Sequence, residues 1–514
     1  MTGGQQILGD MVNPIRVSIR QFYGIEINDF AVTVAKTALW IAESQMMKET
    51  EDIIQMNLDF LPLKTNAFIH EGNALRMDWA AVVPPEKLSY IMGNPPFNGA
   101  MFMKEKRGDV VAAFPECEKP GEIDYVSGWY VKAARYIKST NIRVAFVSTN
   151  SICQGQSVEL LWKPLFNTFA VKIDFAYRSF VWDSEAEKKA HVHVVIVGFS
   201  RKEWVTSPTL YWSDKHESVS FINAYLTDGA NVFVNSRSKP LADIPEIRFG
   251  NMPRDGGFFS LSPEEKRDIE KKEPIAKSFL RPYLGAREFL NGIERWCIWL
   301  LGASNADIRK CPSIVARVEK VRLFRLASKA SATRKMAETA TLFAQIAQPK
   351  GNYIAVPNTS SQRRRYIPMG FLTDYVIANN GLSIIPDATL YHFGILESNV
   401  HMAWMRTVAG RLKSDYRYSK NIVYNTFPWP TPTQAQKDRI EKSAQGILDA
   451  RKNHPEDSLA DLYDPRFMPQ DLRRAHIEND KAVMAAYGFD WRHMKEEDCV
   501  AALMKLYQKL AGEK

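Results

Sequence analysis

A short turn at residues 93–97 (GNPPF) has the side chains to hold a flat, amine-bearing ring. Its two successive prolines fix their φ angles and keep the residue before them out of the helical region, so the turn is stiff and extended. The side-chain oxygen of Asn94 and the carbonyl oxygen of Pro95 can accept the two hydrogens of an exocyclic amine, and Phe97 offers a stacking surface. An Asn-Pro pair alone indicates an ordinary turn. The full set, placed directly after an apolar run, favours a reactive site.

The elements around this turn alternate between strand-like and helical patterns. Runs typical of strands occupy residues 21–27, 89–92, 143–148, 171–176 and 191–199. Apolar spacing from Ala31 through Ile41 predicts a helix after the first run. This alternation predicts an open, doubly wound α/β sheet, whose ligands bind beyond the carboxyl ends of the strands. The turn at 93–97 follows such an end.

Length and charge restrict the class of protein. A chain of 514 residues exceeds the about 250–300 residues that one core usually reaches, so at least two domains are expected. The net charge of +9 has the sign expected of a protein that binds a polyanion. The absence of an apolar run of about 18 residues and of an export signal predicts a cytoplasmic protein without a membrane partner.

The cysteines and histidines do not predict a metal site. The five cysteines are scattered without CxxC pairs, and their odd number fits neither a disulfide framework nor a zinc knuckle. We expect reduced, structural thiols. His191 and His193 alternate along an apolar run, which is typical of packing or edge positions on a strand.

The second half of the chain differs in composition from the first. From about residue 240, Gly-Pro turns and aromatic clusters replace the strand-helix alternation, and after residue 430 the sequence becomes charged and helix-forming. We therefore predict domains at 1–240, 241–430 and 431–514. Within the middle domain, residues 309–335 carry nine Lys or Arg against one acid, which predicts a helix with a basic face.

The turn at 94–97 resembles the (D/N/S)PP(Y/F/W) motif of amino-methyltransferases, which act on N6 of adenine or N4 of cytosine. The NPPF form favours adenine. The resemblance implies S-adenosylmethionine as the methyl donor and a target base flipped out of double-stranded DNA. It gives catalytic roles to Asn94, Pro95, Pro96 and Phe97.

Two further segments resemble the cofactor motifs of the same family. Residues 22–28 (FYGIEIN) resemble the motif whose acid binds the ribose hydroxyls, a role that falls to Glu26. Residues 71–75 (EGNAL) resemble the motif that meets the adenine of the cofactor, a role that falls to Asn73. A surface Glu and an ordinary loop Asn are the alternatives. The predicted cofactor residues are Glu26, Ile27, Asn73, Ala74, Leu75 and Asn94.

Residues 145–155 and 174–194 resemble the later motifs that line the target-base pocket. Aromatic side chains there could pack on the flipped base, although for each one singly a core position is the alternative reading. The candidates for this pocket are Phe97, Tyr177, Phe180 and Trp182.

Nearly the whole chain resembles the MmeI-like restriction-modification group. That resemblance implies a class I, Rossmann-like methyltransferase sheet, then an α+β target-recognition domain over about 243–430, then a C-terminal helical segment. Basic side chains of the second domain are candidates for DNA contact, and a solvated basic face is the alternative. These candidates are Arg322, Arg325, Lys329, Arg363, Arg364 and Arg365.

The chain departs from the family pattern at its start. The glycine loop that cradles the methionine end of the cofactor is absent, so we expect a sheet that is incomplete at the N-terminus and a missing N-terminal segment or partner subunit. No nuclease motif is recognisable, and we expect no DNA cleavage by this chain. The rival readings are methylation of a protein glutamine or an RNA base, and a non-catalytic DNA-specificity module.

Overall fold

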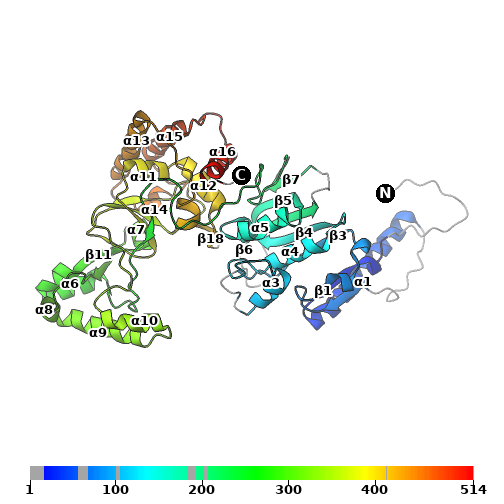
Figure 1. Cartoon of the computed structure of the whole chain (residues 1–514), viewed down its shortest axis with the longest axis horizontal. Helices are drawn as coiled ribbons and strands as arrows, with labels where there is room; N and C mark the ends of the chain where they lie inside the picture. Colours follow the sequence, from blue (N-terminus) through cyan, green and yellow to red (C-terminus); the bar gives the residue numbers. More distant parts are fainter. Residues whose placement is uncertain are drawn as a thin grey trace, which may run out of the picture. The chain divides into compact units, whose positions relative to one another are not determined.

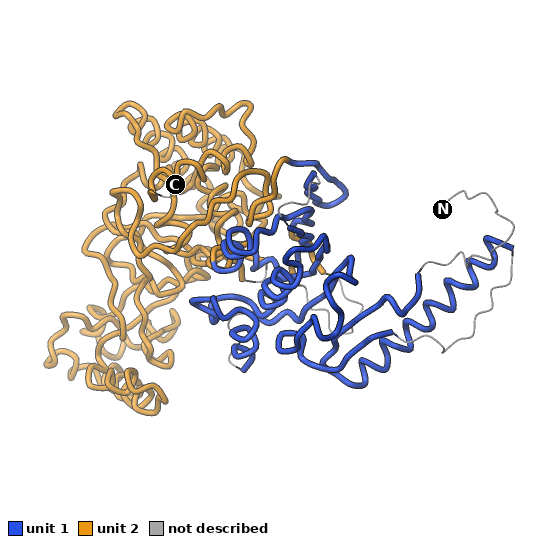
Figure 2. The backbone as a smooth tube through the Cα atoms, turned by 45° about the vertical axis from the view of Figure 1, so that its right-hand side comes forward, with its two compact units in different colours: residues 1–152, 160–178, 194–219 blue, residues 153–159, 179–193, 220–514 orange. Residues whose placement is uncertain are grey.

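The computed structural model describes residues 17–55, 67–99, 103, 105–182, 192–201, 207–412 and 414–512. The chain forms two compact units (Figure 2). The first contains residues 1–152, 160–178 and 194–219, and the second contains residues 153–159, 179–193 and 220–514. No described helix is long and apolar enough to cross a membrane.

The larger sheet near the N-terminal half has six strands in the order β3-β4-β6-β5-β7-β8 (Figure 1). Its strands are β3 (Tyr90–Gly93), β4 (Arg143–Thr149), β5 (Val171–Trp182), β6 (Val192–Arg201), β7 (Thr209–Trp212) and β8 (Lys215–Ser218). Strand β3 runs parallel to β4, and β4 runs antiparallel to β6. The helices α2 (Trp79–Val82), α3 (Arg107–Ala113), α4 (Ser127–Tyr136) and α5 (Ser157–Asn167) accompany it.

Aromatic side chains form the core between this sheet and its helices. The ring of Tyr130 on α4 lies 5.3 Å from that of Phe146 on β4 and 5.5 Å from that of Phe199 on β6, measured between centroids. Trp162 on α5 packs against Tyr130 at 5.7 Å. All four side chains are buried, and a buried ring such as that of Phe146 contributes roughly 1.5–3 kcal/mol.

A separate two-stranded parallel sheet contains β1 (Tyr23–Glu26) and β2 (Phe68–Glu71). Helix α1 (Asp29–Ile54) follows β1 along the chain. The side chain of Asn28 caps this helix. In a doubly wound order 3-2-1-4-5, β2 and β1 match the pair 3-2 and β3 and β4 match the pair 4-5. In the described residues the two pairs belong to separate sheets, and no strand joins β1 to β3.

Strand β3 lies at an edge of the main sheet, and two of its apolar side chains are exposed to solvent. Tyr90 is 65% exposed and Met92 is 81% exposed, although both stand on a strand of the main sheet. The predicted Rossmann-like fold is confirmed, and its sheet is divided in two at this edge.

The middle of the second unit is built on small sheets. One has the order β15-β13-β17-β9 and contains β9 (Arg248–Phe249), β13 (Tyr353–Pro357), β15 (Gly370–Leu372) and β17 (Leu382–Pro386). A second has the order β10-β12-β11-β16 and contains β10 (Ser260–Leu261), β11 (Leu280–Leu284), β12 (Trp296–Ile298) and β16 (Ile377–Ala378). A third contains β14 (Thr359–Ser360), β18 (Arg411–Leu412) and β19 (Asp415–Arg417).

Five helices accompany these sheets in the described part of the second unit, and they are α6 (Pro263–Lys272), α7 (Ala286–Asn291), α8 (Asn305–Arg309), α9 (Pro312–Leu326) and α10 (Ser331–Lys335). The prediction of one basic helix over 309–335 is wrong, because this run is shared among three helices. Pro312 opens α9, where its missing N–H costs nothing. The same proline prevents α8 from continuing into α9.

Helices form the C-terminal part. They are α11 (Leu390–Leu396), α12 (Asn399–Val408), α13 (Gln434–Lys452), α14 (Leu459–Leu462), α15 (Gln470–Tyr487) and α16 (Glu496–Ala511). The predicted segment 431–514 contains α13 to α16, and α11 and α12 precede it within the predicted target-recognition domain. Helix α13 packs against both α15 and α11. An α+β region followed by a helical segment is therefore confirmed for the second unit.

A buried polar network joins the helices of the second unit to its sheets. An Nη atom of Arg451 lies 2.8 Å from a carboxylate oxygen of Glu397, and the exposed fractions of the two side chains are 10% and 0%. Arg451 also donates to the carbonyl of Met369 at 2.6 Å, while Glu397 accepts from the Met369 N–H at 2.7 Å. The Tyr463 hydroxyl contacts Arg451 Nε at 3.0 Å and His476 Nε2 at 2.7 Å. We call these five residues the closed network.

Candidate active site at the carboxyl edge of the main sheet

The turn after β3 presents two hydrogen-bond acceptors that no described residue uses. Asn94 and Pro96 are exposed, Pro95 is buried and Phe97 is half-buried. The Asn98 N–H donates to the Pro96 carbonyl at 3.1 Å and closes the turn. Within the described residues, neither the Asn94 side chain nor the Pro95 carbonyl oxygen has a hydrogen-bond partner. Both oxygens can therefore accept from an incoming ligand.

A second segment holds this turn from the side. The Tyr125 N–H donates to the Asn98 carbonyl at 3.1 Å. The neighbouring Asp124 accepts a hydrogen bond from the Thr149 hydroxyl at 2.9 Å and another from the Ser151 hydroxyl. Thr149 ends β4, so the loops after β3 and β4 meet at residues 124 and 125.

The loop after β2 is organised around a buried carboxylate. Asp109 on α3 accepts from the Asn73 side-chain amide at 3.0 Å, from Arg76 Nε at 2.6 Å and from the Tyr125 hydroxyl at 2.7 Å. Asn73 also accepts from the Leu75 N–H at 2.9 Å. The predicted cofactor residue Asn73 is thus fixed by hydrogen bonds on both ends of its amide.

These contacts set the charges of the cluster. Burial raises the pKa of Asp109, but hydrogen bonds from Tyr125, Arg76 and Asn73 outweigh it, and the pKa is lowered overall. Asp109 is therefore a carboxylate at neutral pH. Burial and the hydrogen bond to Asp109 raise the pKa of Tyr125 to about 12, so its hydroxyl keeps the proton that it donates.

The other predicted cofactor residues lie on both sides of these loops. Glu26 ends β1 and is half-exposed, with one carboxylate oxygen 3.2 Å from the Asn28 N–H. Ile27 is exposed. Leu75 is buried instead and packs against Gly128, where an added Cβ would lie 2.9 Å from a Leu75 methyl carbon. The carbonyl of Ala74 accepts from the Trp79 indole at 2.9 Å.

The predicted aromatic candidates do not all gather at the turn. Phe97 stands on the turn itself. Tyr177 on β5 stacks on Tyr211 of β7, with centroids 4.4 Å apart and planes at 11°. In the strand order β5 is three places from β3, which is about 14 Å at the usual strand spacing. Phe180 and Trp182 form a tilted pair at 6.4 Å, and their role in a base pocket stays a prediction.

The prediction that Arg325 contacts DNA is wrong. Its side chain is 0% exposed. All of its N–H groups donate to backbone carbonyls, those of residues 253, 254, 336, 339 and 342. A guanidinium has no further donor for a phosphate, so Arg325 stabilises the fold of this region.

The remaining basic candidates differ in what they already contact. Arg322 forms a two-bond pair with Glu319 at 2.7 and 2.8 Å. Arg365 lies 3.8 Å from Asp480, and Arg364 is half-buried. Lys329 and Arg363 are exposed, and no described acid lies within ion-pair distance of either. These two are the best placed for a phosphate.

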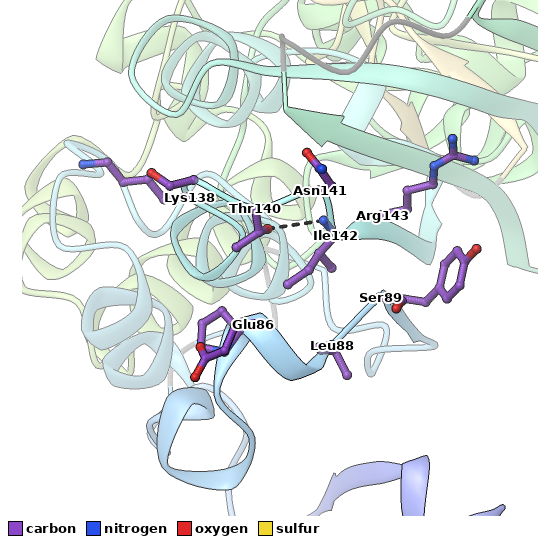
Figure 3. A pocket seen from close by; sticks show the side chains of 11 residues that line it. Glu86, Leu88, Ser89, Lys138, Thr140, Asn141, Ile142 and Arg143 are labelled. Carbon is purple, nitrogen blue, oxygen red and sulfur yellow. Dashed lines mark hydrogen bonds between the residues drawn. The ribbon is translucent and has the colours of Figure 1, made fainter. Parts of the chain in front are cut away.

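A hollow of about 740 Å³ lies at the opposite edge of the sheet, at the amino ends of β3 and β4 (Figure 3). Its lining includes Tyr90 and Arg143, which begin those strands, and Thr140, whose hydroxyl accepts from the Ile142 N–H at 3.3 Å. It is therefore separate from the turn at 93–97, which follows the carboxyl end of β3.

The His, Cys, Asp and Glu side chains of the described residues are the groups that could bind a metal ion. No group of three His, Cys, Asp or Glu side chains there could hold a metal ion. All five cysteines are free, as predicted. His193 is half-buried on β6, and burial lowers its pKa. His191 lies outside the described residues.

Family models match three consecutive parts of the chain. Residues 5–212 match the model described as MmeI, DNA-methyltransferase domain; residues 228–431 match MmeI, target recognition domain; and residues 432–513 match MmeI, C-terminal domain. A solved structure of the type IIL restriction-modification enzyme MmeI in complex with DNA is 41% identical, with a TM-score of 0.90. The match covers 100% of this chain and 69% of the chain in that solved structure. The chain belongs to the MmeI family.

A curated relative supports the same family. DNA methyltransferase A of Bacillus subtilis (strain 168) is 40% identical over 510 residues, which is 98% of this chain. The chain spans 58% of the length of that relative.

The residues of the site for which no role was predicted are Asp109, Asp124 and Tyr125, although residues 124–130 resemble the family as a segment. Their hydrogen-bond partners lie 36, 25 and 16 residues away along the chain, for Asp109 to Asn73, Asp124 to Thr149 and Tyr125 to Asp109. One signal in the sequence is that Asp109, an acidic residue, directly precedes two apolar residues, Val110 and Val111, as a carboxylate near a core would.

Proposed function

We propose that this chain acts as a DNA methyltransferase that transfers a methyl group to N6 of an adenine flipped out of a specific duplex sequence. The setting would be a type IIL restriction-modification system in the cytoplasm. The observation that carries the proposal is the turn after β3, where the Asn94 side chain and the Pro95 carbonyl oxygen have no partner within the described residues. An exocyclic amine has two hydrogens to match these two acceptors.

The residues of this chain hold the target and orient it. Asn94 and Pro95 accept the hydrogens of N6 and so direct its lone pair out of the ring plane, while Phe97 stacks on the base. Positioning of this kind supplies much of the rate of a transfer reaction. No cysteine attack is needed, and burial raises the pKa of the Cys153 and Cys499 thiols to about 12, so they stay protonated.

The residues around the split sheet fit S-adenosylmethionine, which supplies the reactive methyl group when bound. The Glu26 carboxylate is half-exposed at the end of β1, and one of its oxygens has no partner within the described residues, which suits a ribose hydroxyl pair. Asn73 is held by Asp109 at the end of the next strand. We infer that these two residues and Asn94 contact the cofactor.

The proposal is tested by methyl transfer from labelled S-adenosylmethionine to unmethylated DNA, followed by nucleoside analysis. We expect label in N6-methyladenine and a loss of about 10²–10³-fold for Asn94→Ala, since a fixed polar group at a reaction centre has that value. The exposed Asn167→Ala at the end of α5 is the matched control and should keep full activity. Label in N4-methylcytosine, or equal activity of the Asn94 variant, would contradict the proposal.

A non-catalytic DNA-specificity module is the second candidate. The observation that favours it is that β1 and β2, which end near the proposed cofactor residues, form a sheet separate from that of β3 in the described residues. Such a module should bind DNA but give no heat with S-adenosylmethionine in a calorimeter. If transfer appears only when the part of the Bacillus relative that this chain does not span is joined to it, a missing segment or partner is supported over the inert module.

A further inference from the structure

Three loops that are remote in sequence meet at one dipeptide near the turn. These are the loop after β2 that holds Asn73, the turn after β3 that holds Asn94, and the loop after β4 that begins at Thr149. The three loops are not adjacent in the sequence. The turn after β3 bonds to Tyr125 and the loop after β4 bonds to Asp124, while the loop after β2 is connected to Tyr125 through Asp109.

Tyr125 connects the first two loops. Its backbone N–H donates to the Asn98 carbonyl at 3.1 Å, at the end of the catalytic turn. Its hydroxyl donates at 2.7 Å to Asp109, whose carboxylate in turn accepts from the Asn73 amide at 3.0 Å. The side chain is buried, so water cannot readily replace these bonds.

Asp124 connects the third loop. Its carboxylate accepts hydrogen bonds from the Thr149 and Ser151 hydroxyls, on either side of the end of β4. An added Cβ at Gly99 would lie 3.9 Å from the other Asp124 oxygen, so the catalytic turn passes close to the same carboxylate. Asp124 is buried, and hydrogen bonds to a buried charge are stronger than those between neutral groups.

We propose that Asp124 and Tyr125 are positioning residues that hold the catalytic turn in register with the cofactor loop and with the loop after β4. This assignment rests on the proposed function. Neither side chain needs to touch the base or the cofactor. Asp124 acts on the geometry of transfer through the two loops that follow β3 and β4, and Tyr125 acts on cofactor binding through Asp109 and Asn73.

Substitution of the two residues should therefore affect different steps, the transfer reaction for Asp124 and cofactor binding for Tyr125. Asp124→Asn keeps the size of the side chain but replaces one acceptor oxygen by a donor, and we expect kcat to fall about 10²-fold, the cost of a small misplacement. The Kd for S-adenosylmethionine should stay within about threefold, since its contacts are elsewhere. Tyr125→Phe should raise that Kd about tenfold through loss of a hydrogen bond to a charged group, with a smaller change in kcat.

Two controls separate positioning from a general loss of stability. Tyr136→Phe removes a different hydroxyl, which donates to the Val83 carbonyl at 2.5 Å, and burial raises the pKa of Tyr136 to about 12 as it does for Tyr125. It should lower Tm as much as Tyr125→Phe and leave kcat and Kd unchanged. In a Thr149→Val, Ser151→Ala background, Asp124→Asn should lower kcat much less than it does in the wild type, because residues that act through one another are not additive.

Kinetics and calorimetry on the wild type and these variants decide the matter, with Asn94→Ala measured alongside. An active wild type whose Asp124→Asn variant keeps full kcat, or whose Tyr125→Phe variant keeps its Kd, would overturn the positioning assignment and leave the proposed function standing. A wild type that transfers no methyl group, even with the part of the Bacillus relative that it does not span joined to it, would overturn both.

Discussion

The two polar clusters of this protein use the same residue types and arrange them in opposite ways. In the closed network of the second unit, Arg451 bonds to both Glu397 and Tyr463 away from water, and only one oxygen of the Glu397 carboxylate lacks a hydrogen-bond partner among the described residues. Around the turn at 93–97, carboxylates and a tyrosine fix the loops, but the acceptors of Asn94 and Pro95 are left without partners in the described chain. The closed network is buried, whereas Asn94 is exposed, so the side-chain oxygen of Asn94 is accessible to a ligand and the groups of the network are not.

The largest effect should come from opening the closed network. Arg451→Met leaves the Glu397 carboxylate buried and unpaired, and we expect the free energy of unfolding to fall by about 3–5 kcal/mol. Denaturant unfolding followed by circular dichroism measures it. Methyl transfer per folded molecule should not change.

The control for this prediction is Arg439→Met on the same helix α13, where the side chain is exposed. Its unfolding free energy should stay within about 0.5 kcal/mol of the wild type. If both variants behave alike, or if Arg451→Met lowers kcat in the folded protein, the division between a structural and a functional cluster is wrong.

The stability of the second unit should also depend on pH, because it contains the buried carboxyl group of Asp480. Burial raises the pKa of Asp480 to about 6, against hydrogen bonds from Tyr366 and the Asn399 N–H that lower it. The folded state then holds a proton that the unfolded state releases, so stability is greatest below the unfolded pKa of 3.8 and falls as pH rises through 6. The loss between pH 4 and 7 should be about 2–3 kcal/mol.

Asp480→Asn isolates this contribution, because an amide does not titrate. The unfolding free energy of the wild type minus that of the variant should fall by about 2–3 kcal/mol between pH 4 and 7, since only the wild type loses stability from this group. A difference that stays constant with pH would show that Asp480 ionises normally in the folded protein.

Sequence motifs predict which residues carry the chemistry, but they do not predict the hydrogen bonds that hold these residues in place. The strand before Asn94 and the strand that ends at Glu26 were predicted correctly, because motif and apolar run adjoin one another. No role at the site was predicted for Asp109 or Asp124, since their partners come from other loops. The role of Glu26 as a cofactor residue and the domain boundaries at 240 and 430 stay predictions.

The error over Arg325 has the same physical origin. A count of charges along residues 309–335 gives no information about which side chain is buried. Backbone carbonyls from two other segments surround Arg325, and no periodicity in α9 reveals them. Charge runs therefore predict that a surface is basic without saying which residues make it so.

The smallest expected effect concerns the basic residues that the protein leaves open. Lys329→Ala should weaken binding of duplex DNA a few-fold and reduce the slope of log K against log salt by about 1, as for one lost phosphate contact. Lys329→Arg, which keeps the charge, should keep the slope. Arg322→Ala should change it less, because this side chain is already paired with Glu319. Fluorescence anisotropy at several salt concentrations measures all three, and a slope unchanged in Lys329→Ala would remove this residue from the DNA-binding surface.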